Sequence, residues 1–298
     1  MALVIDYDSP AALKTFLDER GMAMQKKFGQ NFLVNAAARK RLIDALEVEE
    51  DMTVWEVGPG LGSMTSEILS RGADVTAFEI DRGFAAVLKE AFNSEQDGQK
   101  QSGKLRLVEG DVLKTWEKES ADNGIAPRFF GNLPYNVASA IVADMISAGV
   151  RFEKAVITVQ KEVAQRITAT PGTEDYSSFT VLCQWAYEVS NVMDLAGGSF
   201  WPRPNVDSRA VKMVRKNDFP RCKDPATFMK VLRAGFLQRR KTLKNNLSSL
   251  AGGAAEASAI LESAGIEPAR RAETLTLDEF LVLSDKVYDA CEEKKVKK

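Results

Sequence analysis

The alternation of hydrophobic and polar positions divides the chain into two parts. From Thr53 to Val159, short runs rich in Val, Ile and Phe alternate with amphipathic stretches of helical length. Strands are expected at 53–57, 74–79, 105–110, 128–132 and 154–159, and two further strand-like runs lie at 188–195 and 208–215. Strands that alternate with helices predict βαβ units with right-handed crossovers. We therefore expect an α/β domain with a mostly parallel, seven-stranded sheet.

Beyond residue 217 the strand pattern gives way to helical spacing. Candidate helices cover 226–247, 255–265 and 276–290, and the pair Gly252-Gly253 is a plausible break between the first two. The pattern thus predicts a larger α/β domain over residues 1–217 and a small all-α domain over residues 218–298.

Composition excludes several classes of protein. The 298 residues are 45% hydrophobic and 28% charged, as in a soluble globular protein. No run approaches the roughly 18 apolar residues of a membrane span, and the N-terminus lacks the features of a secretory signal. Cys183, Cys222 and Cys291 are odd in number and far apart, which favours a reducing cytoplasm. The chain has no histidine, so catalytic triads and His-ligated metals are excluded, and we expect no metal.

Charge is unevenly distributed along the chain. The net charge is only -2, but residues 212–244 hold eleven Lys and Arg against two acids. If residues 228–247 formed one helix, five basic side chains would share one face within an arc of about 100°. Such a face can follow phosphates, although an ordinary solvated basic face is equally compatible with this pattern. The five residues are Lys230, Arg233, Arg240, Lys241 and Lys244. Arg239 would fall on the apolar side, so either it anchors the two domains or the helix breaks there.

A glycine-rich turn follows the first strand of the expected sheet. Gly58, Gly60 and Gly62 lie between this strand and a helix, where glycine lets the backbone approach a ligand closely. The dinucleotide pattern G-x-G-x-x-G is incomplete, because Ser63 occupies its last position. By itself the turn indicates a ligand site of uncertain kind.

Two acids follow the next two strands at the same edge of the sheet. Glu79 lies 21 residues after Gly58, where a carboxylate can accept hydrogen bonds from both ribose hydroxyls of an adenosine ligand. Asp111 follows the third strand, where a carboxylate can accept from an adenine amine. Either acid taken alone could be a helix cap, and the set also fits a nicotinamide cofactor.

The fourth strand ends in Asn132-Leu133-Pro134-Tyr135. This sequence resembles the signature of methyltransferases that modify planar amino groups. The lone pair of an adenine N6 is delocalised, and two acceptors aimed at its hydrogens, the Asn132 side chain and the Leu133 carbonyl, would make it available. Pro134 would stiffen the turn, and Tyr135 could stack on a base turned out of its helix. The alternative is a helix start capped by the asparagine.

A second aromatic residue would complete a clamp around such a base. Phe200 lies in an extended loop that contains Pro202 and Pro204, with Trp201 as a competing candidate. In isolation, Phe200 fits a core position better than a clamp.

Taken together, these segments resemble the 16S rRNA adenine dimethyltransferases of the KsgA type over about residues 15–288. The resemblance rests on the ordered segments KFGQNFL (27–33), VWEVGPGLGSMT (54–65), FEID (78–81), EGDV (109–112), GNLPYN (131–136), QKEVA (160–164), FWPRPNVDS (200–208), QRRKTL (238–243) and GIEPARRAE (265–273).

The resemblance implies a Rossmann-like class I methyltransferase that uses S-adenosylmethionine, with an RNA-binding helical domain at residues 218–298. It implies dimethylation of two adjacent adenines in the 3′-terminal hairpin loop of 16S rRNA, in the small ribosomal subunit or its precursor, by a cytoplasmic monomer. It also makes Phe200 the expected clamp. The cofactor residues expected are Gln30, Asn31, Leu33, Gly58, Gly60, Glu79, Asp111, Val112 and Asn132.

Three other functions share part of this pattern. An Erm-like 23S rRNA methyltransferase has the same fold and cofactor segments, and only the C-terminal segments favour the 16S family. A DNA or protein-glutamine methyltransferase fits Leu133 and the basic region less well. A noncatalytic assembly or transcription factor would not need to keep Asn132, Tyr135, Glu79 and Asp111.

Overall fold

The computed structural model describes residues 3–25, 29–92, 103–134 and 137–296, and the chain divides into two compact units. The first unit comprises Met1–Ala164 and Val189–Arg215, and the second comprises Gln165–Glu188 and Lys216–Lys298. A segment from the middle of the chain thus belongs with the C-terminal helices. The functional division at residue 217, between a methyltransferase domain and an RNA-binding domain, stays a prediction.

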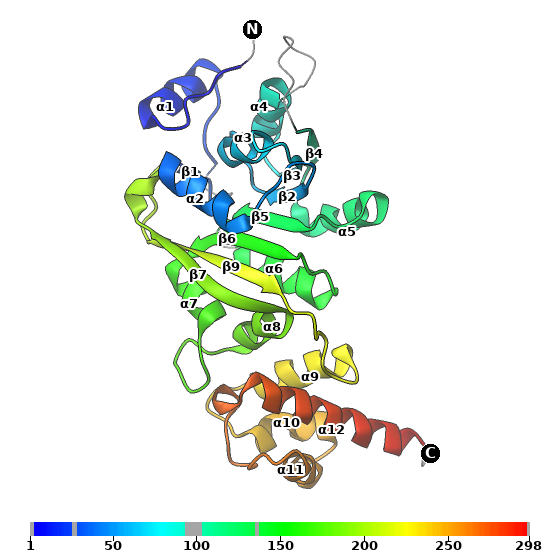
Figure 1. Ribbon diagram of the computed structural model, residues 1–298. Coiled ribbons are helices and arrows are strands. Elements are labelled where there is room, and N and C mark those ends of the chain that lie inside the picture. The colour runs from blue at the N-terminus through cyan, green and yellow to red at the C-terminus, as the bar shows by residue number, and fades with distance from the viewer. Residues whose placement is uncertain (1–2, 26–28, 93–102, 135–136, 297–298) are drawn as a thin grey trace. The chain divides into compact units, whose positions relative to one another are not determined.

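A seven-stranded sheet with the order β4-β3-β2-β5-β6-β9-β7 runs through the first unit (Figure 1). Strands β2 to β6 are parallel to their neighbours, and β9 is antiparallel to β6. The mostly parallel sheet expected from the sequence is therefore confirmed. The strands are β2 (Thr53–Val57), β3 (Asp74–Glu79), β4 (Leu105–Glu109), β5 (Arg128–Asn132), β6 (Lys154–Gln160), β7 (Tyr187–Leu195) and β9 (Ser208–Arg215).

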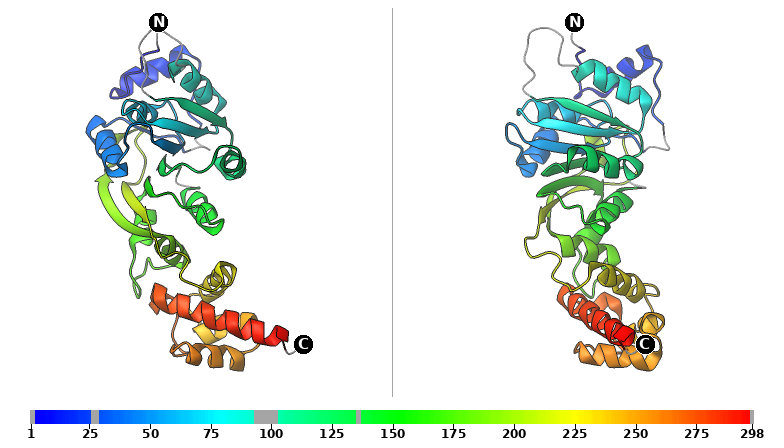
Figure 2. Two further views of the ribbon diagram at one scale, coloured as in Figure 1. Left: turned by 45° about the vertical axis from the view of Figure 1, so that its right-hand side comes forward. Right: turned by 90° about the vertical axis from the view of Figure 1, so that its right-hand side faces the viewer.

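Helices cover both faces of this sheet, as parallel strands require. In the left view of Figure 2, α2 lies on one side of the strands and α5 and α6 lie on the other. Helix α1 packs on the first unit through Leu13 and Leu17, whose side chains are buried in one cluster with Phe32 and Leu61. The helices of this unit are α1 (Pro10–Glu19), α2 (Ala36–Leu46), α3 (Ser63–Leu69), α4 (Arg82–Phe92), α5 (Val112–Asn123) and α6 (Ala138–Ser147).

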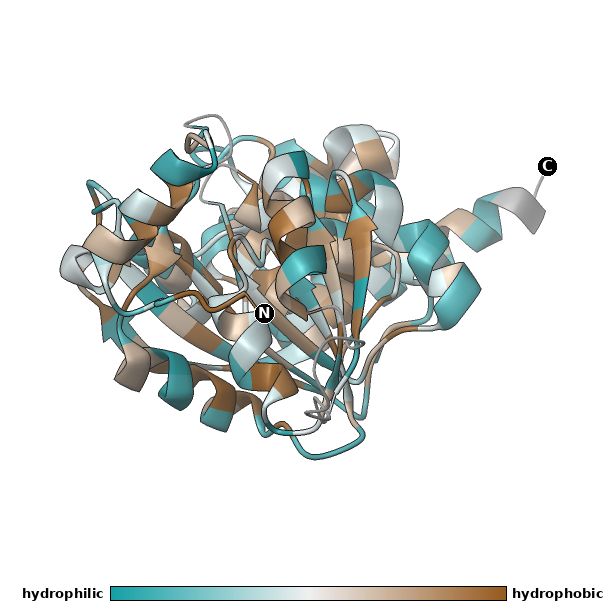
Figure 3. Ribbon diagram, turned by 90° about the horizontal axis from the view of Figure 1, so that it is seen from above, coloured by the Kyte–Doolittle hydropathy of each residue, from teal (hydrophilic) through white to brown (hydrophobic). Residues whose placement is uncertain are grey.

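The strands themselves supply the core of the first unit. Their residues form much of the hydrophobic colouring in Figure 3, and Trp55, Phe78 and Phe130 are almost fully buried. In the strand order, β2 lies between β3 and β5, so the chain changes direction across the sheet there. Ligands of open α/β sheets bind at the carboxyl ends of strands beside such a switch point.

A short second sheet, which was not expected, joins two distant segments. Strand β1 (Phe32–Leu33) pairs antiparallel with β8 (Phe200–Trp201), so that Leu33 lies opposite Phe200. It holds the segment after residue 28 against the proline-containing loop, within the first unit.

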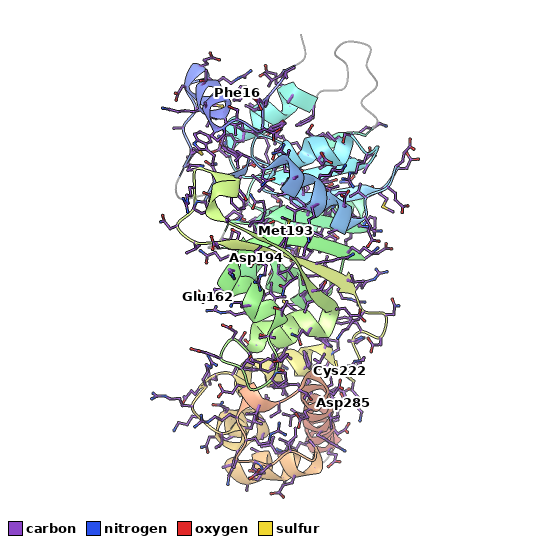
Figure 4. All side chains as sticks on the ribbon, turned by 60° about the vertical axis from the view of Figure 1, so that its left-hand side comes forward. Phe16, Glu162, Met193, Asp194, Cys222 and Asp285 are labelled. Atoms are coloured by element: carbon purple, nitrogen blue, oxygen red, sulfur yellow. The ribbon has the colours of Figure 1, made fainter. Side chains whose placement is uncertain are left out.

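The second unit is helical. It contains α8 (Ser178–Ala186), α9 (Pro225–Gly235), α10 (Leu243–Ala251), α11 (Ala254–Ser263) and α12 (Leu277–Val296), while α7 (Lys161–Thr168) spans the boundary between the units. Its core includes Trp185, whose ring centroid lies 4.3 Å from that of Phe228. Figure 4 shows Cys222 beside Asp285. The three cysteines, Cys183, Cys222 and Cys291, are free thiols. Within the described residues, no helix combines the length and the apolar character needed to cross a bilayer.

The single helix expected over residues 228–247 is wrong. Helix α9 ends at Gly235, and a turn over residues 236–242 leads into α10. The side-chain amide of Asn246 donates hydrogen bonds of 2.6 and 3.1 Å to the carbonyls of Gly235 and Gln238. The first bond satisfies a carbonyl that the end of α9 leaves without a helical partner, and the second joins the turn to α10. The chain therefore reverses where local spacing predicts continuation, and the shared basic face of one helix does not exist.

Candidate active site

Two cavities meet at the carboxyl end of the sheet. The inner cavity, of about 80 Å³, is bounded by residues 29–33, the glycine turn and the end of β5. The adjoining cavity, of about 240 Å³, lies beside β3 and the start of α5. Gly58, Ile80 and Pro134 line both. All nine cofactor residues expected from the sequence line one or both cavities: Gln30, Asn31, Leu33, Gly58, Gly60, Glu79, Asp111, Val112 and Asn132.

The glycine turn needs its glycines for both conformation and space. Gly58 and Gly60 have φ angles of +71° and +58°, which side-chain-bearing residues rarely adopt. A Cβ on Gly60 would lie 3.0 Å from Cε1 of Phe32, and a Cβ on Gly62 would lie 2.5 Å from Phe92. The turn therefore packs closely against its neighbours while its backbone lines the inner cavity.

Two buried carboxyl groups stand on the inner cavity. Glu79 accepts hydrogen bonds from the backbone N–H of Gly60 at 3.0 Å and of Asp81 at 2.8 Å. Glu56 accepts from the Thr65 hydroxyl at 2.6 Å. Burial raises the pKa of Glu79 to about 7 and that of Glu56 to about 8. A cationic ligand in this cavity would favour the charged form of both groups.

Sequence reasoning assigned no role to Glu56. The signal was present, because Glu56 is the one charged residue in the strand TVWEV and stands two positions before Gly58. A carboxyl group in a strand that is otherwise apolar requires a polar partner or a ligand.

Asp111 is a helix cap that also lines a cavity, so its cofactor role stays a prediction. Its Oδ1 accepts from the backbone N–H of Leu113 at 3.1 Å, so the residue is the N-cap of α5. Asp111 also lines the adjoining cavity, together with Ile80, Val112 and Ile141. A cavity lined mostly by apolar residues, with one carboxylate among them, suits an adenine ring, whose amine can donate to the oxygen that does not cap the helix.

The side-chain amide of Asn132 is held in one orientation. Its Nδ2 donates a hydrogen bond of 3.0 Å to the carbonyl of Asn31, so its Oδ1 is left as the acceptor. The backbone N–H of Leu133 donates to the carbonyl of Thr158 at 3.1 Å. Pro134 lines both cavities. Tyr135 lies outside the described residues, so its stacking role stays a prediction.

Phe200 is buried in the core of the first unit and is 4% exposed. Trp201 is half-buried, and its ring stacks on that of Phe32 at a centroid distance of 6.2 Å. The aromatic clamp therefore stays a prediction for Phe200, whose packing also gives it a structural role.

The basic residues expected to bind RNA lie in the second unit, apart from these cavities in the sequence. Lys230 and Arg233 are on α9, Arg240 and Lys241 are in the turn, and Lys244 is on α10. Arg239 is engaged within the unit, since it contacts Glu273 at 3.3 Å and donates to the Glu174 carbonyl at 2.8 Å. Arg240 and Lys241, in contrast, are exposed and form no ion pair with any described residue.

Comparison with known sequences identifies the family to which these features correspond. The family described as ribosomal RNA adenine dimethylase matches residues 21–288. A protein of Treponema denticola described as ribosomal RNA small subunit methyltransferase A is 46% identical over 285 residues, which are 94% of this chain and 95% of that protein. Proteins of the same description from Treponema pallidum and a Geobacillus species are 42% and 33% identical, and each alignment covers 94% of this chain and at least 96% of the relative.

Solved structures share the fold. A dimethyladenosine transferase from Plasmodium falciparum superimposes with a TM-score of 0.73 at 24% identity, covering 86% of this chain and 97% of that one. The 23S rRNA methyltransferase ErmE superimposes with a TM-score of 0.61 at 24% identity, covering 86% of this chain and 99% of that one. The Rossmann-like methyltransferase fold is therefore confirmed.

Proposed function

The chain belongs to the ribosomal RNA adenine dimethylase family, and we propose that it methylates N6 of two adjacent adenines in the 3′-terminal hairpin loop of 16S rRNA. The product would be N6,N6-dimethyladenosine, and the RNA would be part of the small ribosomal subunit or its precursor. The observation that carries this proposal is the fixed amide of Asn132, whose oxygen is left as an acceptor beside the cofactor cavities.

The described residues fit S-adenosylmethionine. Asp111, Ile80 and Val112 would hold the adenine in the adjoining cavity, and Glu79, on the wall of the inner cavity, would accept from the ribose hydroxyls. The inner cavity, with Glu56 and Glu79 on its wall, would take the cationic methionine end. When bound, S-adenosylmethionine supplies an electrophilic methyl group on a sulfonium centre.

The chain itself would act by positioning the target amine. Oδ1 of Asn132 and the carbonyl of Leu133 would accept the two N6 hydrogens, which makes the nitrogen more tetrahedral and its lone pair available. Aligning acceptors and amine in advance is the kind of catalysis that positioning alone provides. The N6 proton leaves to water after the new C–N bond forms, so no histidine is required. In the second transfer the monomethylated nitrogen has one hydrogen left, which one of these two acceptors would accept.

The second unit would hold the RNA. Exposed lysine and arginine side chains contact phosphates without reading sequence. The turn with Arg240 and Lys241, flanked by Lys230 and Arg233 on α9 and Lys244 on α10, offers such contacts. The free thiols agree with action in the reducing cytoplasm.

The test is methyl transfer from labelled S-adenosylmethionine to small ribosomal subunits that lack the modification and, in parallel, to 23S rRNA. Mass spectrometry of the digested RNA identifies the product. We expect N6,N6-dimethyladenosine at two adjacent adenines of 16S rRNA. Label confined to 23S rRNA would instead establish an Erm-like activity, and cofactor binding without any label would leave a noncatalytic assembly factor.

A further inference from the structure

A third cavity shares residues 29–31 with the inner cavity. It measures about 410 Å³, within the usual range of about 300–1,000 Å³ for small-ligand sites. We call it the outer cavity. The segment before β1, the end of β6 and the proline-containing loop after β8 form its wall, through Met24, Gln25, Gly29, Gln30, Asn31, Gln160, Pro202, Arg203, Pro204, Asn205 and Val206.

The wall of the outer cavity has an unusual chemistry. Its polar side chains are all amides or a guanidinium, and no acid is among the described lining residues: Gln25, Gln30, Asn31, Gln160, Asn205 and Arg203. The side chains of Gln160, Arg203 and Asn205 form no hydrogen bond or ion pair with any described residue, so their donors and acceptors remain for a ligand. Asn and Gln amides pair with the edges of bases, and Arg pairs with phosphate. The set therefore suits a nucleotide.

Apolar surfaces complete the fit. Pro202 and Pro204 flank Arg203, and the exposed Val206 follows them in the same loop. Such surfaces can contact the face of a base while the amides contact its edge. The wall therefore offers an arginine for the phosphate, amides for the edge of the base and apolar side chains for its face.

The position of Asn132 indicates whether the outer cavity would hold the target adenine or another nucleotide. Asn132 lines the inner cavity but is not on the described wall of the outer one. A base in the outer cavity is therefore not the one whose N6 meets Asn132. Because the two cavities share Gly29, Gln30 and Asn31, they are close enough to serve neighbouring nucleotides of one strand.

We propose that the outer cavity binds the nucleotide next to the target adenine, with its base edge on Gln160 and Asn205 and its phosphate on Arg203. This inference rests on the proposed function. It gives the enzyme a means of selecting an adenine that has a particular neighbour, which positioning at Asn132 cannot supply.

The wall is built before any RNA arrives. Gln25 and Gln30 both donate to Oδ2 of Asp81, at 3.0 and 3.1 Å, and Oδ1 of Asp81 accepts from the backbone of Gly83 at 2.8 Å. On the opposite wall, a Cβ on Gly197 would lie 3.0 Å from Nε of Arg203, so the arginine packs closely over that glycine. A preorganised pocket loses less entropy when it binds its ligand.

The experiment compares small ribosomal subunits with both adenines against subunits in which one or the other adenine is replaced by uridine. We would measure kcat/KM at each remaining adenine for the wild type, Gln160→Ala and Arg203→Ala. Asn205→Ala is a second base-edge variant in case Gln160→Ala fails to fold, and an unchanged cofactor Kd verifies folding. Arg41→Ala and Asn191→Ala are matched controls, because both side chains are exposed and line none of the three cavities.

For the wild type, we expect one uridine replacement to lower kcat/KM by about tenfold or more, the usual loss when a base-specific contact is missing. On the unsubstituted subunits, Gln160→Ala should have a kcat/KM that is lower than that of the wild type by the same factor. The uridine replacement that slows the wild type should then not lower the kcat/KM of this variant further. Arg203→Ala should raise KM on all three substrates alike. Equal wild-type rates on every substrate, or variants that behave like the controls, would overturn the inference. Failure of the wild type on unsubstituted subunits would instead reject the proposed function.

Discussion

The side-chain amide of Asn132 and the backbone carbonyl of Asn31 are joined by a hydrogen bond of 3.0 Å across 101 positions of sequence. Asn132 ends β5, and Asn31 lies just before β1. One bond thus fixes which atom of the amide is the acceptor and ties the N-terminal segment to the sheet. Because Asn31 contributes its backbone, this orientation does not depend on the Asn31 side chain.

Asn132→Ala should lower kcat for methyl transfer by at least about a hundredfold, comparable with the removal of one preorganised hydrogen-bonding group from an active site. The cofactor Kd, measured by calorimetry, should remain measurable. Asn191→Ala is the control, since this exposed asparagine lines none of the three cavities, and it should retain kcat. Full activity of Asn132→Ala would refute the acceptor role.

Asp111 allows the helix cap and the cofactor contact to be separated. Asparagine caps helices about as well as aspartate, so Asp111→Asn should leave the free energy of unfolding nearly unchanged. It should still raise the cofactor Kd by about tenfold, because a charged hydrogen bond contributes about 1.5–3 kcal/mol. Asp111→Ala should lose both stability and affinity. An unchanged Kd in both variants would leave Asp111 as a cap only.

Phe200→Leu distinguishes a core residue from a base clamp. Leucine keeps much of the buried apolar volume at this 4%-exposed site, so we expect a loss of about 1–2 kcal/mol in the free energy of unfolding, well below the ~3–5 kcal/mol of Phe→Ala. A clamp would also raise KM for the RNA substrate several-fold, because leucine cannot stack. Trp201→Leu is the control for the neighbouring ring. Unchanged KM in Phe200→Leu would confine Phe200 to the core.

The parts of the structure that the sequence predicts are those set by local patterns. Strands such as 53–57 and 74–79, and the turn at Gly58, follow from periodicity and glycine spacing, and the structure places them at the same residues. The prediction of one helix over 226–247 is wrong because a side chain eleven residues away stabilises a reversal of the chain. Asn246 donates to the carbonyl of Gly235, and helix propensity does not reveal this contact. The β1–β8 pairing and the outer cavity join segments far apart in the chain, which periodicity alone cannot bring together.

Glu56 should make the protein less stable as pH rises. Its pKa is about 8 in the folded protein, against an ordinary value of 4.5. Between these values the unfolded chain has released the proton that the folded protein retains, so the free energy of unfolding falls across this window. Glu56→Gln keeps an acceptor for Thr65 and has no proton to release. We expect it to reduce the fall by on the order of 3 kcal/mol.

Urea unfolding near pH 5 and near pH 8 measures this effect. Some pH dependence should persist in Glu56→Gln, because Glu79, with a pKa of about 7, acts in the same direction. Glu50→Gln, an exposed glutamate in the same unit, is the control. Parallel pH profiles for the wild type and Glu56→Gln would show that Glu56 is ionised in the folded protein throughout this range.

The basic turn of the second unit should set the salt dependence of RNA binding. Lys241 is exposed in the turn, and Lys244 begins the next helix. Each phosphate contact contributes about 0.7–0.9 to the slope of log K against log salt. Lys241→Glu/Lys244→Glu should therefore lower the magnitude of that slope by about 1.4–1.8, measured by filter binding of the small-subunit RNA at several salt concentrations. Lys114→Glu/Lys118→Glu on α5 changes the net charge equally and serves as the control. If both double variants change the slope alike, net charge alone controls the affinity, and an unaltered slope in the first would place the RNA elsewhere on the protein.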